Sequence, residues 1–418
     1  MEAAGKRVVV IGAGIIGVSA AVFLQQQGKH VTLIDPLPPG EGASFGNAGG
    51  VAVCEILPTI TVQTVLKIPR WLIDPLGPLS IRGSHFFQSL PWFLKALRNS
   101  TPKRVAKITE ARAALSLRAH SDFQHVLQAA NLQDILHKRE ALRIYETKAE
   151  YQAEQSRLKV QRDYGYENAF LTPGEVNELE PAITKQIHGA TFHSGWHYIS
   201  NPGRLVSSLA ELVIRNGGVI LRDEVKKLEI GEGKVQALQT EQGQRLELDQ
   251  LVICAGAYSN LLASQLGERA SLEAERGYHI MIPEPGISLS RSITCARTPA
   301  VATPMEGGLR LAGTDEFAGL YKPPNYARAD ALWHHFKHIF PGLAAPDARA
   351  TRWMGRRPGT PDSLPVIGPS KTCRNVWYGF GHGHMGLTWG PTTGRMLSEL
   401  MTSQPTNTDL TAFRMDRF

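Results

Sequence analysis

Short apolar runs separated by small or polar residues define the first elements of the chain. Residues 8–11 and 31–34 are apolar runs of strand length, and residues 15–27 carry an apolar face at helical spacing that Gly28 ends. The pattern therefore predicts a strand, a helix and a second strand. Further along, it predicts a buried strand at 251–257, a hairpin around Gly231–Gly233, and helices at 101–137, 147–163, 203–217, 328–340 and 386–401.

Three glycines and one acid occupy special places in the opening strand–helix–strand unit. Gly12 permits a tight turn, Gly14 lets the backbone approach a pyrophosphate, and Gly17 lets the helix lie close to the strand. Asp35 follows Gly17 by 18 residues and is placed to accept hydrogen bonds from a ribose. This spacing predicts a dinucleotide-binding unit, with the phosphates over the N–H groups where Ile15 and Ile16 open the helix. The motif alone leaves NAD and FAD open.

Two segments that run from a strand into small residues, at 8–17 and 251–259, flank the middle of the chain. We therefore expect an α/β protein whose nucleotide-binding domain is built from discontinuous segments. The intervening segments would form a second, antiparallel β-rich substrate domain. The cofactor and the substrate would meet at the junction between the two domains. The expected boundaries are 1–56, 201–266 and 352–418 for the nucleotide-binding domain, and 57–200 and 267–351 for the substrate domain.

Composition narrows the class of partner. The net charge of the 418 residues is +7, but no run of five Lys or Arg occurs. We therefore expect no nucleic-acid partner. The basic residues instead indicate a solvated basic surface or one that attracts acidic lipid. The four cysteines form no C-x-x-C motif, which fits a reducing compartment. A core strand begins near Arg7 and no run of 18 apolar residues exists, so we expect a cytoplasmic protein without a signal peptide or a membrane-spanning helix.

Later glycine-rich segments carry a resemblance to a known family. They are Ser44–Gly49, the strand at Val225, Cys254–Ala257, Gly355–Asp362 and Gly379–Gly386. Together with the opening motif they resemble the D-amino-acid oxidase/dehydrogenase superfamily of FAD flavoproteins over the whole chain. Residues 43–49 and 361–368 are most similar to bacterial FAD-dependent D-amino acid dehydrogenases. The resemblance implies FAD rather than NAD, bound in a Rossmann-like domain of the glutathione-reductase type.

The resemblance also implies which residues contact the flavin cofactor. Ser44 and Asn47 would face the pyrophosphate and flavin, Ala48 and Gly49 would approach the edge of the ring, and the Val225 backbone would meet the adenine. The N-terminal N–H groups of the last helix would stabilise negative charge on the reduced flavin. The remaining expected cofactor residues are Ala255, Gly256, Gly383, Met385 and Gly386.

Three substrate-site residues follow from the same resemblance. An arginine in a G-x-R-P context binds the substrate carboxylate in this superfamily, and Arg357 has the matching register, although its neighbour Arg356 stays open as an alternative. Tyr278 is expected over the flavin, where it would hydrogen-bond to the carboxylate or enclose the site. His384 would donate to the flavin or line the pocket. We expect no metal, because His334 and His338 lack a third ligand and lie off the apolar stripe of their helix.

The expected activity is oxidative deamination of a D-amino acid, in which hydride transfer from Cα to flavin N5 gives an imino acid and then a 2-oxo acid and ammonia. No dedicated base is needed if the amine binds in its neutral form. A D-proline or cis-4-hydroxy-D-proline dehydrogenase that gives a pyrroline carboxylate is the alternative within this class. A flavin-binding subunit of a larger complex is the alternative from another class.

Residues 56–98 suggest the electron acceptor. The runs 68–73 and 86–94 are apolar and aromatic, with Lys67, Arg70, Lys95 and Arg98 at their edges. Such a composition suits the surface of an anionic membrane, where a quinone could accept the electrons. We therefore expect a dehydrogenase peripheral to the cytoplasmic face of the inner membrane. The alternative is that these residues pack under the second domain or at a subunit contact.

Overall fold

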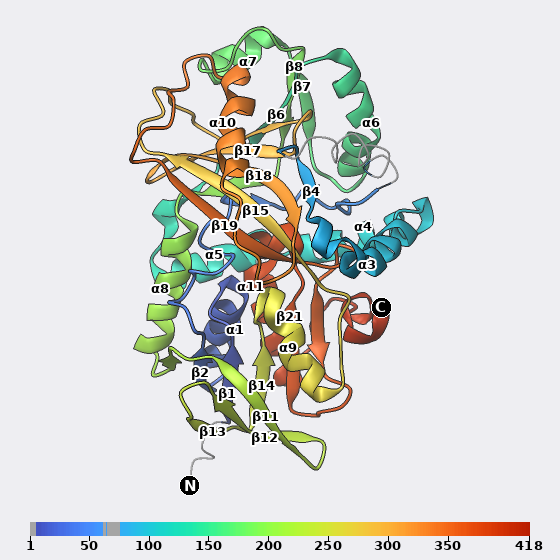
Figure 1. The fold of residues 1–418 in the computed structure, drawn as a ribbon, viewed down its shortest axis with the longest axis vertical. Helices are drawn as coiled ribbons and strands as arrows, with labels where there is room; N and C mark the ends of the chain where they lie inside the picture. Colours follow the sequence, from blue (N-terminus) through green and yellow to red (C-terminus); the bar gives the residue numbers. More distant parts are fainter. Residues whose placement is uncertain (1–5, 62–63, 65–75) are drawn as a thin grey trace.

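Two large β-sheets, each with its own helices, make up the molecule. The computed structural model describes residues 6–61, 64 and 76–418. In Figure 1 the nucleotide-binding sheet and helix α1 lie in the lower half, and the larger sheet with α10 lies above them. This arrangement confirms the expected α/β fold with a second, largely antiparallel unit.

The six-stranded lower sheet is parallel except for its edge strand β20, which pairs antiparallel with β21. Strand β1 is central and buried, and it pairs with β2 on one side and β14 on the other. A parallel strand that is buried on both faces needs a continuous run of apolar residues, and β1 has one. In spatial order the strands are β10 (Val219–Leu221), β2 (His30–Ile34), β1 (Arg7–Ile11), β14 (Gln250–Ile253), β21 (Val376–Phe380) and β20 (Val366–Pro369).

Helix α11 (Gly386–Met401) crosses α1 (Ile15–Gln26) at close range. An ideal Cβ at Gly394 would lie 2.6 Å from the Ser19 carbonyl carbon, so a side chain there would force the helices apart. The crossing brings the start of α11 to the glycine-rich turn after β1. Helices α5 (Ala119–Ala130) and α8 (Pro202–Arg215) pack on the same core.

The larger sheet has nine strands and is mostly antiparallel. Strands β15 and β19 pair over nine positions and extend downward to the nucleotide-binding sheet (Figure 1). Its strands are β19 (Thr351–Gly359), β15 (Glu273–Ile282), β18 (Gly308–Phe317), β17 (Ala300–Met305), β16 (Ile293–Cys295), β6 (Ala141–Tyr145), β8 (Gly189–His193), β7 (Asn168–Leu171) and β4 (Leu79–Ile81).

Smaller elements complete the fold. Two three-stranded sheets consist of β11 (Val225–Gly231), β12 (Lys234–Thr240) and β13 (Arg245–Glu247), and of β3 (Gly50–Ala52), β9 (Trp196–Ile199) and β5 (Leu136–His137). The other helices are α3 (Phe86–Asn99), α4 (Pro102–Ser116), α6 (Lys148–Asp163), α7 (Pro173–Leu179), α9 (Ser259–Ala263) and α10 (Ala327–Ile339).

Two segments pair or pack across the expected domain boundaries, which stay a prediction. All of strand β19 except Thr351 falls within residues 352–418, which were expected in the nucleotide-binding domain, and it pairs with β15 in the larger sheet. Helix α5 falls within residues 57–200, which were expected in the substrate domain, yet it packs against α11 and α8. In both cases long-range packing overrides position in the chain.

Candidate active site

A single cavity of about 1310 Å³ is lined by residues of both units. It takes in the turn after β1, the loop at 44–48, the end of β14, the start of α11, and strands β15, β18 and β19. Of the expected cofactor residues, the cavity wall includes Gly12, Gly14, Ile15, Ile16, Asp35, Ser44, Asn47, Ala48, Val225, Ala255, Gly256, Gly383, Met385 and Gly386.

The turn after β1 depends on two glycines. Gly12 has φ +104°, and an ideal Cβ there would lie 2.3 Å from the Cys254 carbonyl oxygen. An ideal Cβ at Gly17 would lie 1.8 Å from the Gly12 carbonyl oxygen. Gly17 is therefore needed for the close approach of α1 to this turn, as its place in the motif predicts, and it is not part of the cavity wall.

Two polar side chains organise the nucleotide end of the cavity. The Asp35 carboxylate accepts hydrogen bonds from the N–H groups of Ala13 (2.8 Å) and Leu37 (2.9 Å). Burial raises the pKa of Asp35, against these backbone hydrogen bonds. Ser44 Oγ accepts from the Ile15 N–H at 3.0 Å, at the first turn of α1. Both side chains retain acceptor capacity next to an open wall, which suits a ribose and a pyrophosphate.

The loop at 44–49 is tied to the larger sheet. Asn47 Oδ1 accepts from the Gly49 N–H at 2.7 Å, and the Asn47 carbonyl accepts from the Arg310 guanidinium. His279 Nδ1 lies 3.0 Å from the Gly46 carbonyl oxygen. Gly49 itself has φ +78° and packs against the Ile199 backbone rather than lining the cavity. The sheet thus fixes a loop whose backbone faces the cavity.

The start of α11 closes another part of the wall. Residues Gly383–Met385 form a single 3₁₀ turn, and α11 continues from Gly386. The first N–H groups of a helix have no partner within it, so this end of α11 presents donors and the positive end of the helix dipole. With the turn after β1 and the loop at 44–48, this wall fits an extended dinucleotide with an anionic centre, as FAD requires.

Arg357 lies on the larger sheet with one charged partner. Its Nη1 donates to Asp315 Oδ1 at 2.6 Å and to the Thr314 carbonyl at 3.3 Å. The guanidinium lies against Gly277, where an ideal Cβ would be 2.1 Å from Nη2. By contrast, Arg356 Nε donates to the Leu320 carbonyl at 2.6 Å. Of the two adjacent arginines, the structure brings Arg357 to the group that also contains His384.

His384 lies between two carboxylates. Its Nε2 is 3.5 Å from Asp315 Oδ1, and its Nδ1 is 3.7 Å from Glu275 Oε2. Burial would raise the pKa of Asp315, but His384 and Arg357 outweigh it and lower that pKa to about 2. Burial raises the pKa of Glu275 to about 7, although His384 and Arg357 act in the opposite direction. The two acids therefore differ in protonation near neutral pH.

Glu275, Asp315 and His384 also have the donor types of a metal site, with ligand atoms within 4.8 Å of one another. Arg357 Nη1 already contacts Asp315 Oδ1, so a cation is supplied by the chain itself. The group therefore already holds a positive charge beside its acids. His334 and His338 are exposed on α10, as expected of a solvated face.

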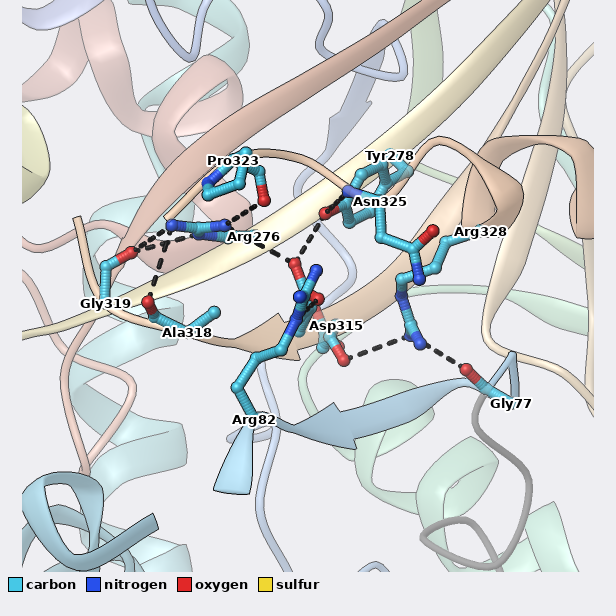
Figure 2. A network of polar contacts seen from close by, with 11 residues as sticks. Gly77, Arg82, Arg276, Tyr278, Asp315, Ala318, Gly319, Pro323, Asn325 and Arg328 are labelled. Atoms are coloured by element: carbon cyan, nitrogen blue, oxygen red, sulfur yellow. Dashed lines mark hydrogen bonds and ion pairs between the residues drawn. The ribbon is translucent and has the colours of Figure 1, made fainter. Parts of the chain in front are cut away.

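The Tyr278 hydroxyl has hydrogen-bond partners other than Glu275, Asp315 and His384. Figure 2 shows its hydroxyl in a polar network with Arg276 and Asn325, where it donates to Glu316 Oε2 at 2.5 Å and accepts from the Asn325 N–H at 3.0 Å. Side chains alternate along β15, so the side chains of Glu275 and Tyr278 leave the strand on opposite faces, and both residues are among those that line the cavity. Burial raises the pKa of Tyr278 to about 12. The hydroxyl is engaged with Glu316 and Asn325, and the expected role of Tyr278 toward the substrate stays a prediction.

Sequence reasoning missed Glu275 and Asp315. They are 40 residues apart on β15 and β18, and no motif links them. The sequence does not single them out, because β15 also contains Glu273 and Arg276, and β18 also contains Glu316.

The fold and cavity define a flavin-dependent oxidoreductase, and comparison with known proteins agrees. A model of the DAO family, described as FAD dependent oxidoreductase, matches residues 7–400, and the chain belongs to this family. It is 33% identical to a D-amino-acid oxidase of Bradyrhizobium diazoefficiens, over 99% of both chains. It is 28% identical to a D-amino acid dehydrogenase of Paramagnetospirillum magneticum, again over 99% of both.

Solved structures agree in fold. Glycine oxidase from Geobacillus kaustophilus superposes with a TM-score of 0.78 at 20% identity, covering 99% of both chains. L-proline dehydrogenase from P. horikoshii superposes with a TM-score of 0.75 at 19% identity, covering 99% of this chain and 98% of the other.

Proposed function

We propose that the protein catalyses FAD-dependent oxidative deamination of D-amino acids. The observation that carries the proposal is Arg357, placed beside His384 in the cavity that also contains the cofactor loops. When bound, FAD supplies the two-electron acceptor for oxidation at Cα. The relatives named D-amino-acid oxidase and D-amino acid dehydrogenase support the D-amino-acid class of substrate.

Arg357 binds the substrate carboxylate in this proposal. Its hydrogen bonds within the described residues use Nη1, which leaves the Nε and Nη2 edge of the guanidinium for a ligand. Asp315 holds the guanidinium against Gly277 and so fixes its plane. A planar fork can bind a carboxylate with two parallel hydrogen bonds, which the ammonium of Lys cannot do.

The test is anaerobic mixing of the yellow protein with paired D- and L-amino acids, D-proline and cis-4-hydroxy-D-proline included. We expect the flavin to bleach faster with the D-enantiomers. Faster bleaching with D-proline or cis-4-hydroxy-D-proline than with the other D-amino acids would show that the protein is a D-proline type of dehydrogenase. Equal or faster bleaching by L-amino acids would refute the proposal.

Variants of the arginine pair test the site. An unpaired carboxylate in a desolvated site costs about 2–5 kcal/mol, so Arg357→Ala should lower kcat/KM by about 30-fold to several thousand-fold. Arg357→Lys should recover only part of this loss. Arg356→Ala is the matched control. If Arg356→Ala is damaging and Arg357→Ala is mild, the carboxylate-binding role belongs to Arg356.

We further propose that the electron acceptor is a quinone at an anionic membrane surface. Helix α3 carries an exposed apolar face, with Phe87 81%, Leu94 58% and Leu97 50% exposed. The same helix supplies Trp92 and Phe93 to the cavity wall. One helix therefore contributes both to an exposed apolar surface that could contact lipid and to the wall of the cofactor cavity.

Basic residues next to this face support an anionic surface. Lys95 and Arg98 are exposed on α3, and Lys103 and Lys107 are exposed on α4. Each basic residue near an anionic membrane contributes about 1 kcal/mol to binding. The other apolar run of this segment, residues 68–73, lies outside the described residues. In the part of the chain that the structure describes, no helix has the length and apolar character needed to cross a membrane.

Sedimentation with anionic and neutral liposomes tests the surface. We expect binding to anionic liposomes at low salt that high salt releases. The double variant Phe87→Ser/Leu94→Ser should reduce it. Leu117→Ser, at a residue 83% exposed outside α3, is the control. Protein that stays in the supernatant at low salt, and reduces oxygen as fast as a quinone analogue, would replace this proposal with an oxidase that acts away from the membrane.

A further inference from the structure

The acids beside Arg357 impose a charge requirement on the substrate. Arg357 contributes one positive charge, which it shares with Asp315, and the cavity wall also carries Glu275 and His384. A substrate that entered as a carboxylate with a neutral amine would add another negative charge to this group. A zwitterion adds none, because its ammonium can lie against a carboxylate.

We propose that Glu275 accepts the proton of the substrate ammonium and thereby converts the bound zwitterion to the amine that is oxidised. This inference rests on the proposed function. It departs from the expectation that no dedicated base is needed, and it assigns a catalytic role to a residue that no sequence motif identified.

The geometry around Glu275 suits a proton acceptor. It pairs with Arg357 across β15 and β19, so both side chains lie on the same face of the sheet. Its carboxylate lies over Gly359, where an ideal Cβ would be 2.0 Å from Oε1. The side chain is 11% exposed and forms part of the cavity wall.

The charged groups around Glu275 come from four elements. His384 precedes α11, Asp315 is on β18, Arg357 is on β19, and Glu273 is two residues away on β15. Burial and the two neighbouring acids raise the pKa of Glu275 to about 7, against His384 and Arg357. Above that pH the carboxylate is charged and can accept a proton. Below it, Glu275 is already protonated and the route is lost.

The proton balance is simple. One N–H bond of the substrate ammonium breaks, its electron pair stays on nitrogen, and an O–H bond forms on Glu275. The neutral amine can then donate its lone pair to Cα as the bond to hydrogen breaks. His384 is 3.7 Å from Glu275 and its side chain is 36% exposed, so the proton can pass from Glu275 through the imidazole to solvent.

The first experiment is the pH profile of kcat/KM for wild type and Glu275→Gln. For wild type we expect a rise through about pH 7 and a fall as the substrate loses its ammonium proton, near pH 10 for an alkylamine. The variant must use the rare neutral amine. Its kcat/KM should therefore be about 100-fold lower than wild type at pH 8 and should rise tenfold per pH unit toward pH 10.

The control variant is Glu284→Gln, at a surface glutamate with a 72% exposed side chain. It should keep the wild-type profile. A Glu275→Gln profile that matches wild type in shape and height would overturn the role of Glu275, provided that wild type oxidises D-amino acids. Failure of wild type to oxidise any D-amino acid would instead refute the proposed function.

Benzoate binding gives a second readout that needs no turnover. Benzoate has a carboxylate and no amine, so it should bind wild type more tightly as pH falls through about 7 and Glu275 loses its charge. The perturbation of the flavin spectrum reports the Kd. Glu275→Gln should show flat, tight binding across this range. Wild-type affinity that does not change between pH 6 and 8 would overturn the inference even if the variant fails to fold.

Discussion

Gly277→Ala tests whether the carboxylate-binding site depends on the bare backbone beneath Arg357. An ideal Cβ at this position would lie 2.1, 2.2 and 2.4 Å from Nη2, Cζ and Nη1 of Arg357. Ordinary contact between such atoms is about 3.5 Å, so the guanidinium must move by more than about 1 Å. It cannot do so and keep the 2.6 Å bond to Asp315 in its present plane.

The expected loss is large for catalysis and small for stability. A misplacement of about 1 Å in a binding group can lower kcat/KM by about 100-fold, equivalent to about 2.7 kcal/mol. The displaced atoms are the end of a flexible side chain, and alanine is favoured over glycine in a strand by about 0.5–1 kcal/mol. The melting temperature should therefore stay the same or rise slightly while kcat/KM for D-amino acids falls.

The measurements are steady-state kinetics, thermal unfolding and flavin content of the same preparations. Gly307→Ala is the matched control, because an ideal Cβ there meets nothing within 4 Å. It should be neutral in all three. Wild-type kcat/KM in Gly277→Ala would refute the assigned place of Arg357. A lower melting temperature with lost flavin would show that the substitution acts through folding instead.

Three further predictions follow from close contacts. Gly14→Val should purify with little flavin absorbance, because Gly14 faces the cavity and an ideal Cβ there is already 3.3 Å from Ser44 Oγ; full occupancy would refute this. Tyr278→Phe removes a hydrogen-bond donor from Glu316 and should lower the free energy of unfolding, measured in urea, by about 1.5–3 kcal/mol. Its kcat/KM should stay close to wild type, and a large loss of kcat/KM would show that the hydroxyl takes part in catalysis. Gly394→Leu should destabilise the fold by about 1–3 kcal/mol in the same assay through the crossing of α1 and α11, and an unchanged midpoint would contradict that packing.

Local patterns were enough to predict the nucleotide-binding end of the site. The turn at 12–17 and Asp35 belong to one strand–helix–strand unit, so residue type and spacing within about 30 residues determine it. The substrate end depends on strand register and on side-chain alternation. A shift of one residue in strand pairing moves every side chain to the other face of the sheet. The sequence alone does not determine which residues face the cavity. Glu275 and Tyr278 show the result, since both line the cavity, but the unassigned acid lies beside His384 while the hydroxyl of the predicted tyrosine binds Glu316.

The distance along the chain between the strands of the nucleotide-binding sheet has a consequence for synthesis. Val8 on β1 pairs with Gln250 on β14, and β14 pairs in turn with β21, near residue 376. Closing such long loops is entropically slow, and although β2 follows β1 directly, the ribosome releases β14 and β21 only much later. The cofactor cradle therefore cannot form on the nascent chain until α11 has emerged. Flavin capture becomes one of the last events in folding, and a chain that ends before residue 386 would lack the helix that packs on α1 and the end of α11 that lines the cavity.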